Sequence, residues 1–178
     1  PITEETVMTT EDVVLQFGER AVLEPLGAGI TPATQPTLLS PGDTEAALAS
    51  ADQFEQKARE EYETADYLTV PMDFTFTIAL NRSETLLWAW GWCAADAATL
   101  TDNLNKMDIA FTLNGEDVPP DQFLRLDYES GGQQCTAYLL GVEDWAGGEH
   151  HAVTTLTFTA PLNDGVYNFP AGVQTFYY

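Results

Sequence analysis

Residues 72–93 constrain the fold of this chain more than any other segment, because two runs of alternating apolar residues flank a short polar break. The first run places one apolar set at every second position: Met72, Phe74, Phe76, Ile78 and Leu80. The second run places Leu86, Trp88, Trp90 and Trp92 on one face, and Leu87, Ala89, Gly91 and Cys93 on the other. A period of two is typical of β-strands, and the Asn81-Arg-Ser83 break between them is typical of a turn. The segment therefore predicts a β-hairpin.

The two cysteines, Cys93 and Cys135, both lie in the β-rich part of the chain, 42 positions apart. We expect them to form a disulfide if the protein is exported, and closing a loop of this length stabilises a fold by about 4 kcal/mol in the chain-entropy model. Two buried free thiols are the alternative. A catalytic cysteine is disfavoured, because the only histidines, His150 and His151, are adjacent in one segment.

The net charge excludes several classes of partner. The 178 residues contain 28 acidic and 6 basic side chains, a formal charge of −22, with 44% apolar residues. Nucleic acids and anionic membrane surfaces reward clustered Lys and Arg, so neither is expected as a partner. The charge suits a solvated surface, a saline habitat or divalent-cation binding. No apolar stretch reaches the length of a membrane span. The chain starts at Pro1, which suggests a mature product without its targeting segment.

The first third of the chain divides into two predicted parts. Residues 1–43 form a Thr/Pro-rich lead whose short apolar runs, 13–17 and 21–26, could be edge strands. Residues 44–65 are rich in Ala and Glu and predict one long helix. Its apolar positions recur at spacings of three and four, at Leu48, Ala51, Phe54, Ala58, Tyr62 and Ala65. We expect this helix to pack its apolar side on the following domain.

Residues 66–178 predict about seven strands separated by short turns. Asp96 is placed to cap a short helix through Met107 that bridges two strands. Turns are expected at Asn114-Gly115, at Gly131-Gly132 and at Asn163-Asp-Gly165. The strand at 135–142 is apolar on both faces, which indicates a central position in a sheet, and residues 150–160 form a further strand. Such spacing is typical of a β-sandwich.

The segment 66–178 resembles the immunoglobulin-like and fibronectin-like domains of bacterial secreted and lipid-anchored surface proteins. The resemblance rests on Trp145-Ala-Gly-Gly-Glu-His150, on Asn163-Asp-Gly165 with Tyr167, and on Phe169-Pro-Ala-Gly172. It implies a mainly β, immunoglobulin-like antiparallel β-sandwich outside a bacterial cell, with the N-terminal helix packed on it. The chain departs from antibody domains, because its tryptophans precede Cys93 and Gln133 replaces the corner tyrosine. No functional residue is carried over.

Three indoles form the strongest candidate site. Trp88, Trp90 and Trp92, two residues apart on one strand face, would make an aromatic strip about 13 Å long that could stack on sugar rings or a peptide. The competing interpretation is that the three indoles belong to the core or are covered by the helix at 44–65.

Acidic turns offer weaker candidates for calcium. Asp117, Asp121, Asp144 and Asp164 place carboxylates in turns, where Ca²⁺ ligands are often found, but none has the spacing of a dedicated calcium loop. We therefore expect no dedicated metal site and no cofactor. His150 and His151 would point to opposite faces of a strand, so they do not predict a shared metal ion either.

No catalytic motif appears in the sequence, so we expect no enzyme activity. The preferred interpretation is a non-catalytic binding, adhesion or structural module, monomeric, secreted or anchored on the surface of a bacterial cell, with an unknown protein or glycan as partner. One alternative is a carbohydrate-binding module that uses the aromatic strip. The other is a hydrolase built on a jelly roll, which requires convergent carboxylates or a His-carboxylate pair.

Overall fold

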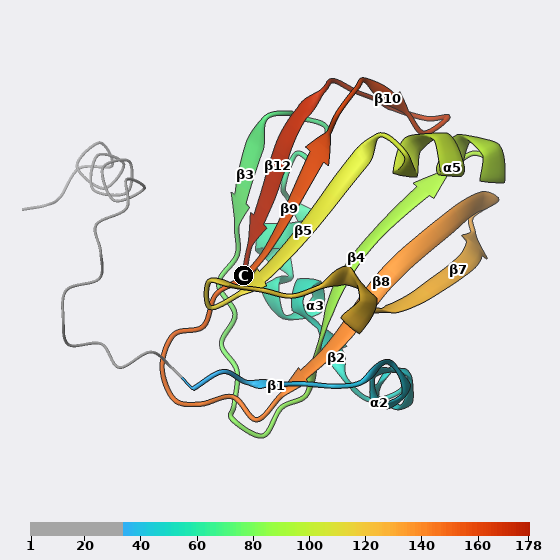
Figure 1. The fold of residues 1–178 in the computed structure, drawn as a ribbon. Coiled ribbons are helices and arrows are strands. Elements are labelled where there is room, and N and C mark those ends of the chain that lie inside the picture. The colour runs from blue at the N-terminus through green and yellow to red at the C-terminus, as the bar shows by residue number, and fades with distance from the viewer. Residues whose placement is uncertain (1–33) are drawn as a thin grey trace, which may run out of the picture. The chain divides into compact units, whose positions relative to one another are not determined.

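The computed structural model describes residues 34–178, except for the side chain of Glu60. This part of the chain is mainly β and contains two five-stranded sheets and a short two-stranded ribbon (Figure 1). Sheet A comprises β1 (Thr37–Leu38), β2 (Asp52–Gln53), β4 (Leu86–Ala94), β7 (Leu124–Ser130) and β8 (Gln133–Glu143). Sheet B comprises β3 (Met72–Thr75), β5 (Met107–Leu113), β6 (Glu116–Asp117), β9 (Ala152–Phe158) and β12 (Gly172–Tyr177). The ribbon is β10 (Leu162–Asn163) with β11 (Asn168–Phe169). The expected edge strands at 13–17 and 21–26 lie outside the described residues.

Sheet A is organised around β8, the central strand expected from its two apolar faces. β4 pairs with β8 antiparallel over its whole length, from Leu86 opposite Val142 to Ala94 opposite Gln134. β7 and β1 pair with the other edge of β8, also antiparallel. On the outer edge of β4, the short β2 pairs in parallel with Leu86 and Leu87 only. Beyond Leu87, this edge of β4 has no partner among the described strands.

Sheet B has the order β3-β12-β9-β5-β6 and is mixed. β3 runs parallel to β12, with Phe74 opposite Phe176, whereas all other pairs are antiparallel. The expected strand at 150–160 is confirmed as β9. Its buried positions alternate with half-buried ones, and Ala152, Leu156 and Phe158 are all buried.

The predicted hairpin over residues 72–93 is wrong, because its two strands belong to different sheets. β3 pairs with β12 in sheet B, and β4 pairs with β8 in sheet A. The chain between them crosses from one sheet to the other, and Ile78 and Leu80 pack against the core on the way. The alternation at 72–80 corresponds to a strand only over residues 72–75, and residues 76–80 lie outside the strands. Alternation also contains no information about which strand is the partner.

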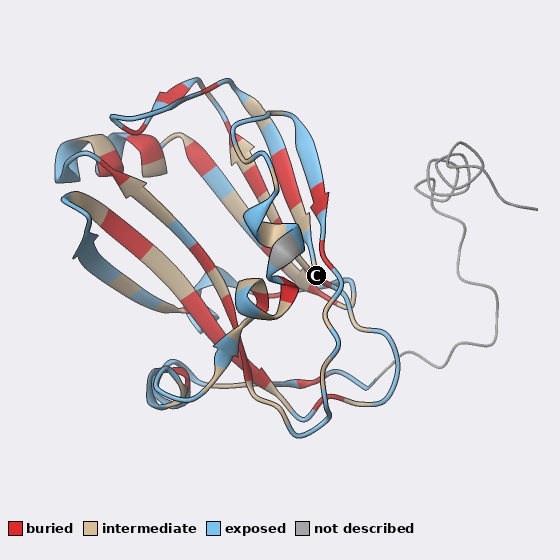
Figure 2. Cartoon of the chain, turned by 180° about the vertical axis from the view of Figure 1, so that it is seen from behind, coloured by how far each residue is buried: buried red, intermediate tan, exposed pale blue. Residues whose placement is uncertain are grey.

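The two sheets pack their inner faces against each other in a sandwich-like layout. Trp88 of β4 contacts Phe111 of β5 edge to face, with ring centroids 5.4 Å apart, and its indole nitrogen donates to the Thr154 hydroxyl of β9 at 2.9 Å. Trp92 meets Phe158 of β9 in the same way. Buried and exposed residues alternate along the strands, as expected for two sheets that share one core (Figure 2).

Two tight turns form where the sequence predicts them. Asn114 and Gly115 join β5 to β6, and Gly131 and Gly132 join β7 to β8, each as a two-residue loop between paired strands. All four residues have positive φ, from 51° to 82°. This conformation is the one that two-residue hairpins require, and it explains the preference for Asn and Gly at these sites.

The single helix predicted for residues 44–65 is also wrong, because this segment contains shorter elements. The helices are α2 (Pro41–Ala47), α3 (Phe54–Ala58) and α4 (Glu60–Glu63), with β2 between α2 and α3. The free edge of β4 supplies backbone partners for Asp52 and Gln53, which extends the chain there. Arg59, at φ 43°, separates α3 from α4. Ser40, whose side chain accepts from the Asp43 amide, is the N-cap of the first helix.

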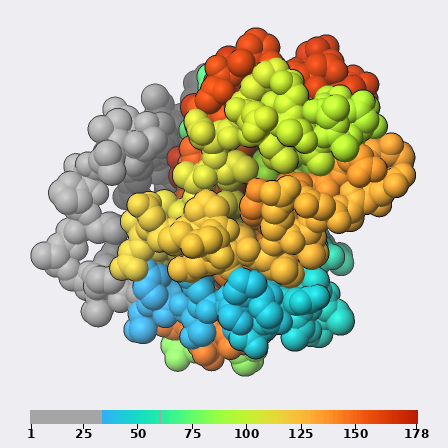
Figure 3. Space-filling model, turned by 45° about the vertical axis from the view of Figure 1, so that its right-hand side comes forward, coloured from blue at the N-terminus to red at the C-terminus, as the bar shows by residue number. Residues whose placement is uncertain are grey.

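The start of this segment nevertheless packs on the sandwich, as the space-filling view shows for residues 34–50 beneath the segment 116–130 (Figure 3). Thr44 of α2 is fully buried, and its hydroxyl accepts a hydrogen bond from the Gly141 amide of β8 at 3.0 Å. The short strand-bridging helix is confirmed as α5 (Ala97–Leu104), capped by Asp96 and ending before Met107, where β5 begins. None of the helices in the described part of the chain is long and apolar enough to cross a membrane.

Candidate functional site

The three indoles of β4 point inward between the sheets. Trp88 is 0% exposed and Trp90 is 9% exposed, and Trp92 is half-buried. They therefore do not form an exposed strip. Leu87, Ala89, Gly91 and Cys93 occupy the outer face, as the alternation predicts. Of the three, Trp90 and Trp92 reach a cavity between the sheets.

This inter-sheet cavity has a volume of about 550 Å³ and lies along the free edge of β4. Its walls come from both sheets and from the segment that connects them, and around the free edge of β4 they include the outer-face residues Ala89, Gly91 and Cys93. The aromatic wall residues that are buried or half-buried are Trp90, Trp92, Tyr62, Tyr67, Phe169, Phe176 and Tyr178. Exposed side chains, Leu68, Tyr128 and Tyr167, also border it, so it opens to solvent. A largely aromatic cavity of this size is within the usual range of small-molecule sites.

Glu55 contributes the carboxyl group of this cavity from the first turn of α3. Its Oε1 accepts a hydrogen bond from the Tyr178 hydroxyl at 2.9 Å. Its Oε2 is buried and has no hydrogen-bond partner among the described residues. Burial raises the pKa of Glu55 to about 7, against the weaker lowering effects of a backbone hydrogen bond and of Tyr178. Burial therefore outweighs the hydrogen bonds, and the carboxyl group titrates near neutral pH.

Three tyrosines surround this carboxyl group. The rings of Tyr62 and Tyr67 lie 5.1 Å apart, and the Tyr67 hydroxyl donates to the Tyr62 carbonyl. Burial raises the pKa of Tyr62 to about 12, and burial likewise raises the pKa of Tyr67 and of Tyr178. All three phenols are therefore neutral at physiological pH, and the Tyr178 hydroxyl is the one that donates to Glu55.

Trp92 contributes the second unusual polar group. Its ring packs edge to face on Phe169 and Phe158, with centroids 4.9 and 5.9 Å away. Its Nε1–H is buried and has no acceptor within the described part of the chain. By contrast, the indole nitrogens of Trp88 and Trp145 donate to Thr154 and to the Glu84 carbonyl. Within residues 34–178, the buried side-chain polar atoms without a partner are this nitrogen and Glu55 Oε2.

A second hollow, of about 730 Å³, lies between residues 75–82 and the segment 145–152. It is less informative, because both ring nitrogens of its His150 have partners within the protein. The His150 ring receives a hydrogen bond from the Asn114 amide at Nδ1 and donates from Nε2 to the Ala146 carbonyl, each at 3.1 Å. These partners suit the tautomer that carries a proton on Nε2 and accepts at Nδ1. A third hollow, lined by Lys57, Arg59 and other polar residues of 52–63, adjoins the inter-sheet cavity at Glu55 and Tyr62.

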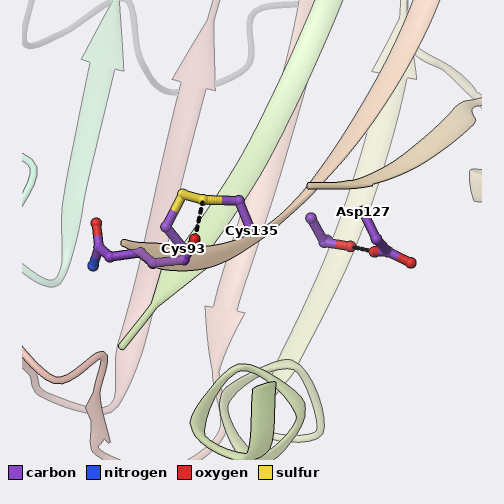
Figure 4. Close-up of a disulfide and its surroundings, with 5 residues drawn as sticks. Cys93, Asp127 and Cys135 are labelled. Carbon is purple, nitrogen blue, oxygen red and sulfur yellow. Dashed lines mark hydrogen bonds between the residues drawn. A yellow bond between two sulfur atoms is a disulfide. The ribbon is translucent and has the colours of Figure 1, made fainter. Parts of the chain in front are cut away.

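The expected disulfide between Cys93 and Cys135 is confirmed (Figure 4). The two residues are direct cross-strand partners in sheet A, with Cα atoms 4.0 Å apart. The bond therefore links neighbouring strands of one sheet, whereas in antibody domains it links the two sheets. Beside it, the buried Thr136 hydroxyl donates to Asp127 of β7, and this bond, with Arg125, holds the pKa of Asp127 below its usual value.

The four calcium candidates are separated in the structure. Asp117 lies in β6 and Asp121 in the 3₁₀ helix Pro120–Gln122. Asp144 accepts a hydrogen bond from the Thr37 hydroxyl at 3.1 Å. Asp164 directs Oδ1 to the amides of Val166 and Tyr167, at 2.7 and 2.6 Å, and so stabilises the β10–β11 turn. Among residues 34–178, no group of three or more His, Cys, Asp or Glu side chains is arranged to hold a metal ion.

The sequence does not single out Glu55 as a candidate site residue. Glu55 is one of several acids in the Ala- and Glu-rich segment 44–65, and the pattern places Tyr62 on the apolar side of the expected helix. The available signal was local: Glu55 directly follows Phe54, which is 2% exposed, so the side chain starts at the edge of the core. Tyr178 could not be connected to Glu55 from sequence, because the two are 123 positions apart.

Comparison of the chain with protein-family models, with curated proteins and with solved structures finds no match.

Proposed function

We propose that this chain is a non-catalytic binding domain that takes a small ligand into the inter-sheet cavity. One observation supports the proposal most strongly: Glu55 Oε2 and Trp92 Nε1–H, the two buried polar atoms without partners among the described residues, both belong to residues that line this cavity. A buried donor or acceptor without a partner costs about 1–3 kcal/mol. A ligand that supplies both partners removes this cost on binding.

The composition of the cavity favours binding over catalysis. Glu55 is the one carboxylate among its described wall residues, and no histidine lines it. Hydrolysis of a glycosidic bond generally needs two carboxyl groups that flank the scissile bond. The cavity therefore supports a site in which one carboxyl group orients a ligand, and the jelly-roll hydrolase is the less favoured interpretation.

The proposal includes export, an extracellular location on a bacterial cell and an immunoglobulin-like classification of the sandwich-like layout. Export is supported by the Cys93–Cys135 disulfide, because disulfides persist mainly in oxidising compartments. The classification is supported by two facing, mostly antiparallel sheets with short turns. The position of the disulfide within one sheet is a departure from the antibody pattern.

Carbohydrate binding is a second candidate, and a specific feature favours it. Trp90, Trp92 and Tyr67 offer aromatic rings in one cavity, and indole faces stack well on sugar rings. In this version, the ligand is a terminal sugar that enters the cavity, because the indoles do not form an open strip.

The experiment is a calorimetric and tryptophan-fluorescence panel of soluble oligosaccharides, amino acids, and neutral and cationic small organic molecules. Wild type is compared with Trp92→Phe, which replaces the indole by a smaller aromatic ring and removes the donor, and with Tyr177→Phe, which removes an exposed hydroxyl outside the cavity. We expect a compound that binds wild type and Tyr177→Phe equally and Trp92→Phe roughly tenfold more weakly. Equal binding to all three proteins, or no binding by any compound, contradicts the proposal.

A further inference from the structure

We infer that the ligand of the inter-sheet cavity carries a positively charged ammonium group that pairs with Glu55, together with an oxygen acceptor for the Trp92 indole. This inference rests on the proposed function of the cavity and specifies its ligand. It follows from the charges, ring faces and hydrogen-bond partners around the two residues.

The first step concerns the missing counter-ion of Glu55. Lys57, two residues along the same helix, is already bound to Glu84 at 3.0 Å and to Asp52 at 3.4 Å. Arg59 forms no ion pair with Glu55, nor does any other basic side chain of residues 34–178. The carboxyl group receives one hydrogen bond, from Tyr178, and its second oxygen has no described partner. A ligand cation would therefore be its first partner of opposite charge.

The second step concerns the walls. The cavity presents Tyr62, Tyr67 and Tyr178 around the carboxyl group, with Trp90 and Trp92 further along β4. Faces of Trp and Tyr rings attract ammonium groups through the ring quadrupole, most strongly where water is excluded. A site that combines several such rings with one carboxylate has the composition that recognises an organic cation.

The third step concerns the donor at Trp92. An indole N–H can only donate, so its partner must be an acceptor such as a hydroxyl, ether or carboxylate oxygen. The ligand therefore has two polar groups: a cationic group that pairs with Glu55 and an oxygen that accepts from Trp92. Small amino alcohols and their N-methylated forms have this chemistry, and a cavity of about 550 Å³ is large enough for them.

The net charge of the whole chain also favours a cationic ligand. A formal charge of −22 creates a negative potential that concentrates cations near the surface and speeds their encounter with a site. It also disfavours anionic ligands of the same size.

The experiment uses two pairs of probes that differ mainly in charge. Choline is compared with 3,3-dimethylbutan-1-ol, in which carbon replaces the ammonium nitrogen, and benzylamine is compared with benzyl alcohol. Calorimetry measures each dissociation constant at pH 8, where Glu55 is ionised. We expect at least one cation to bind roughly tenfold or more tightly than its neutral partner, because its charge interacts with both Glu55 and the ring faces.

Glu55→Gln keeps the size of the side chain and removes its charge, so we expect it to abolish the preference for the cation. The matched control is Glu116→Gln, which makes the same change in net charge on an exposed residue that lines none of the three hollows described above. This control should keep the preference. Tyr178→Phe, which removes the donor to Glu55 but leaves the carboxylate, should also keep it.

A pH series gives a readout that a structural role of Glu55 would not change. Glu55 shares the cavity with the phenols of Tyr62, Tyr67 and Tyr178, all with raised pKa, and it shares the adjoining hollow with Asp52, Lys57, Arg59 and Glu63. No histidine is among the described wall residues of either. Between pH 5 and 8, Glu55 is therefore the wall residue that changes charge. Cation affinity should rise over this interval with release of a proton at pH 6, and the affinity of the neutral probe should stay constant.

The outcomes separate this inference from the proposed function. If a cation and its neutral partner bind equally, and Glu55→Gln changes neither, the inference is overturned and the cavity remains a binding site. If none of the four probes binds, the inference is also overturned, and the wider panel with Trp92→Phe still decides the proposed function. If Glu55→Gln still binds the cation more tightly than its neutral partner, another group recognises the charge, and the inference is contradicted.

Discussion

Glu55 makes the stability of the fold depend on pH in an unusual direction. Most carboxyl groups in folded proteins have lowered pKa values and stabilise the fold as pH rises, but burial raises the pKa of Glu55 from 4.5 to about 7. Between these values, the folded state keeps a proton that the unfolded state has released. The stabilisation of the fold by Glu55 is therefore fully present below pH 4.5 and is lost as pH rises through 7. This loss lowers the free energy of unfolding by about 3 kcal/mol.

We therefore predict that Glu55→Gln gains stability relative to wild type as pH increases. The difference in the free energy of unfolding should be near zero at pH 4.5 and reach about 3 kcal/mol at pH 8, because the glutamine side chain cannot ionise. Urea denaturation at several pH values measures it, with Glu116→Gln as the control for net charge. A difference that does not vary with pH would show that the carboxyl group is well solvated.

Trp90 provides a second prediction at the residue scale. Its side chain is 9% exposed and packs on Tyr138, so replacement by Ala should remove buried area and leave a cavity. We predict that Trp90→Ala lowers the free energy of unfolding by about 3–5 kcal/mol, measured by urea denaturation. A loss below about 1 kcal/mol would mean that the ring is solvated in solution, and would restore the exposed strip as an interpretation.

At the scale of elements, α2 depends on one buried hydrogen bond to sheet A. The Thr44 hydroxyl accepts from the Gly141 amide, and Thr44 is fully buried. Thr44→Val keeps the shape but leaves this amide without its partner, so we predict a loss of about 1–3 kcal/mol in urea denaturation. Thr101→Val, on the exposed side of α5, is the matched control and should change stability by less than about 0.5 kcal/mol. Equal effects of the two changes would contradict the docking of α2.

The disulfide stabilises the pairing of β4 with β8. We predict that replacing both Cys93 and Cys135 with Ala lowers the free energy of unfolding by about 4 kcal/mol, because the bond closes a loop with a sequence separation of 42. Thiol titration of the unfolded, unreduced protein should find no free thiol from this pair. Two titratable thiols would remove the main support for export.

Particular elements show what the sequence could and could not predict. Alternation correctly separated the inner and outer faces of β4, and Asn-Gly and Gly-Gly correctly marked two turns, because both signals are local. The partner of β3 is not local: the same alternation would appear whether β3 paired with β4 or with β12. The prediction of one helix at 44–65 was wrong for the same reason, because Asp52 and Gln53 pair with the edge of β4, which is distant in sequence.

At the scale of the whole described domain, the candidate site arises from how the chain connects the two sheets. Residues 54–71 pass from the edge of sheet A to the edge of sheet B, and thereby bring Glu55, Tyr62 and Tyr67 to the side where β4 has no strand partner. Tyr178, directly after β12, joins these three residues through its hydrogen bond to Glu55. No sequence motif encodes this arrangement, because its members come from separate segments.

The most direct test of the account is the indole N–H region of a ¹H–¹⁵N correlation spectrum, recorded while the tightest-binding compound of the panel is titrated in. Trp92→Phe assigns the Trp92 signal, and Trp88 and Trp145 serve as internal controls because their N–H groups already donate within the protein. The account predicts that the Trp92 signal shifts on binding as its N–H gains an acceptor, while the signals of Trp88 and Trp145 stay in place. Saturable binding that leaves the Trp92 signal unchanged would contradict it.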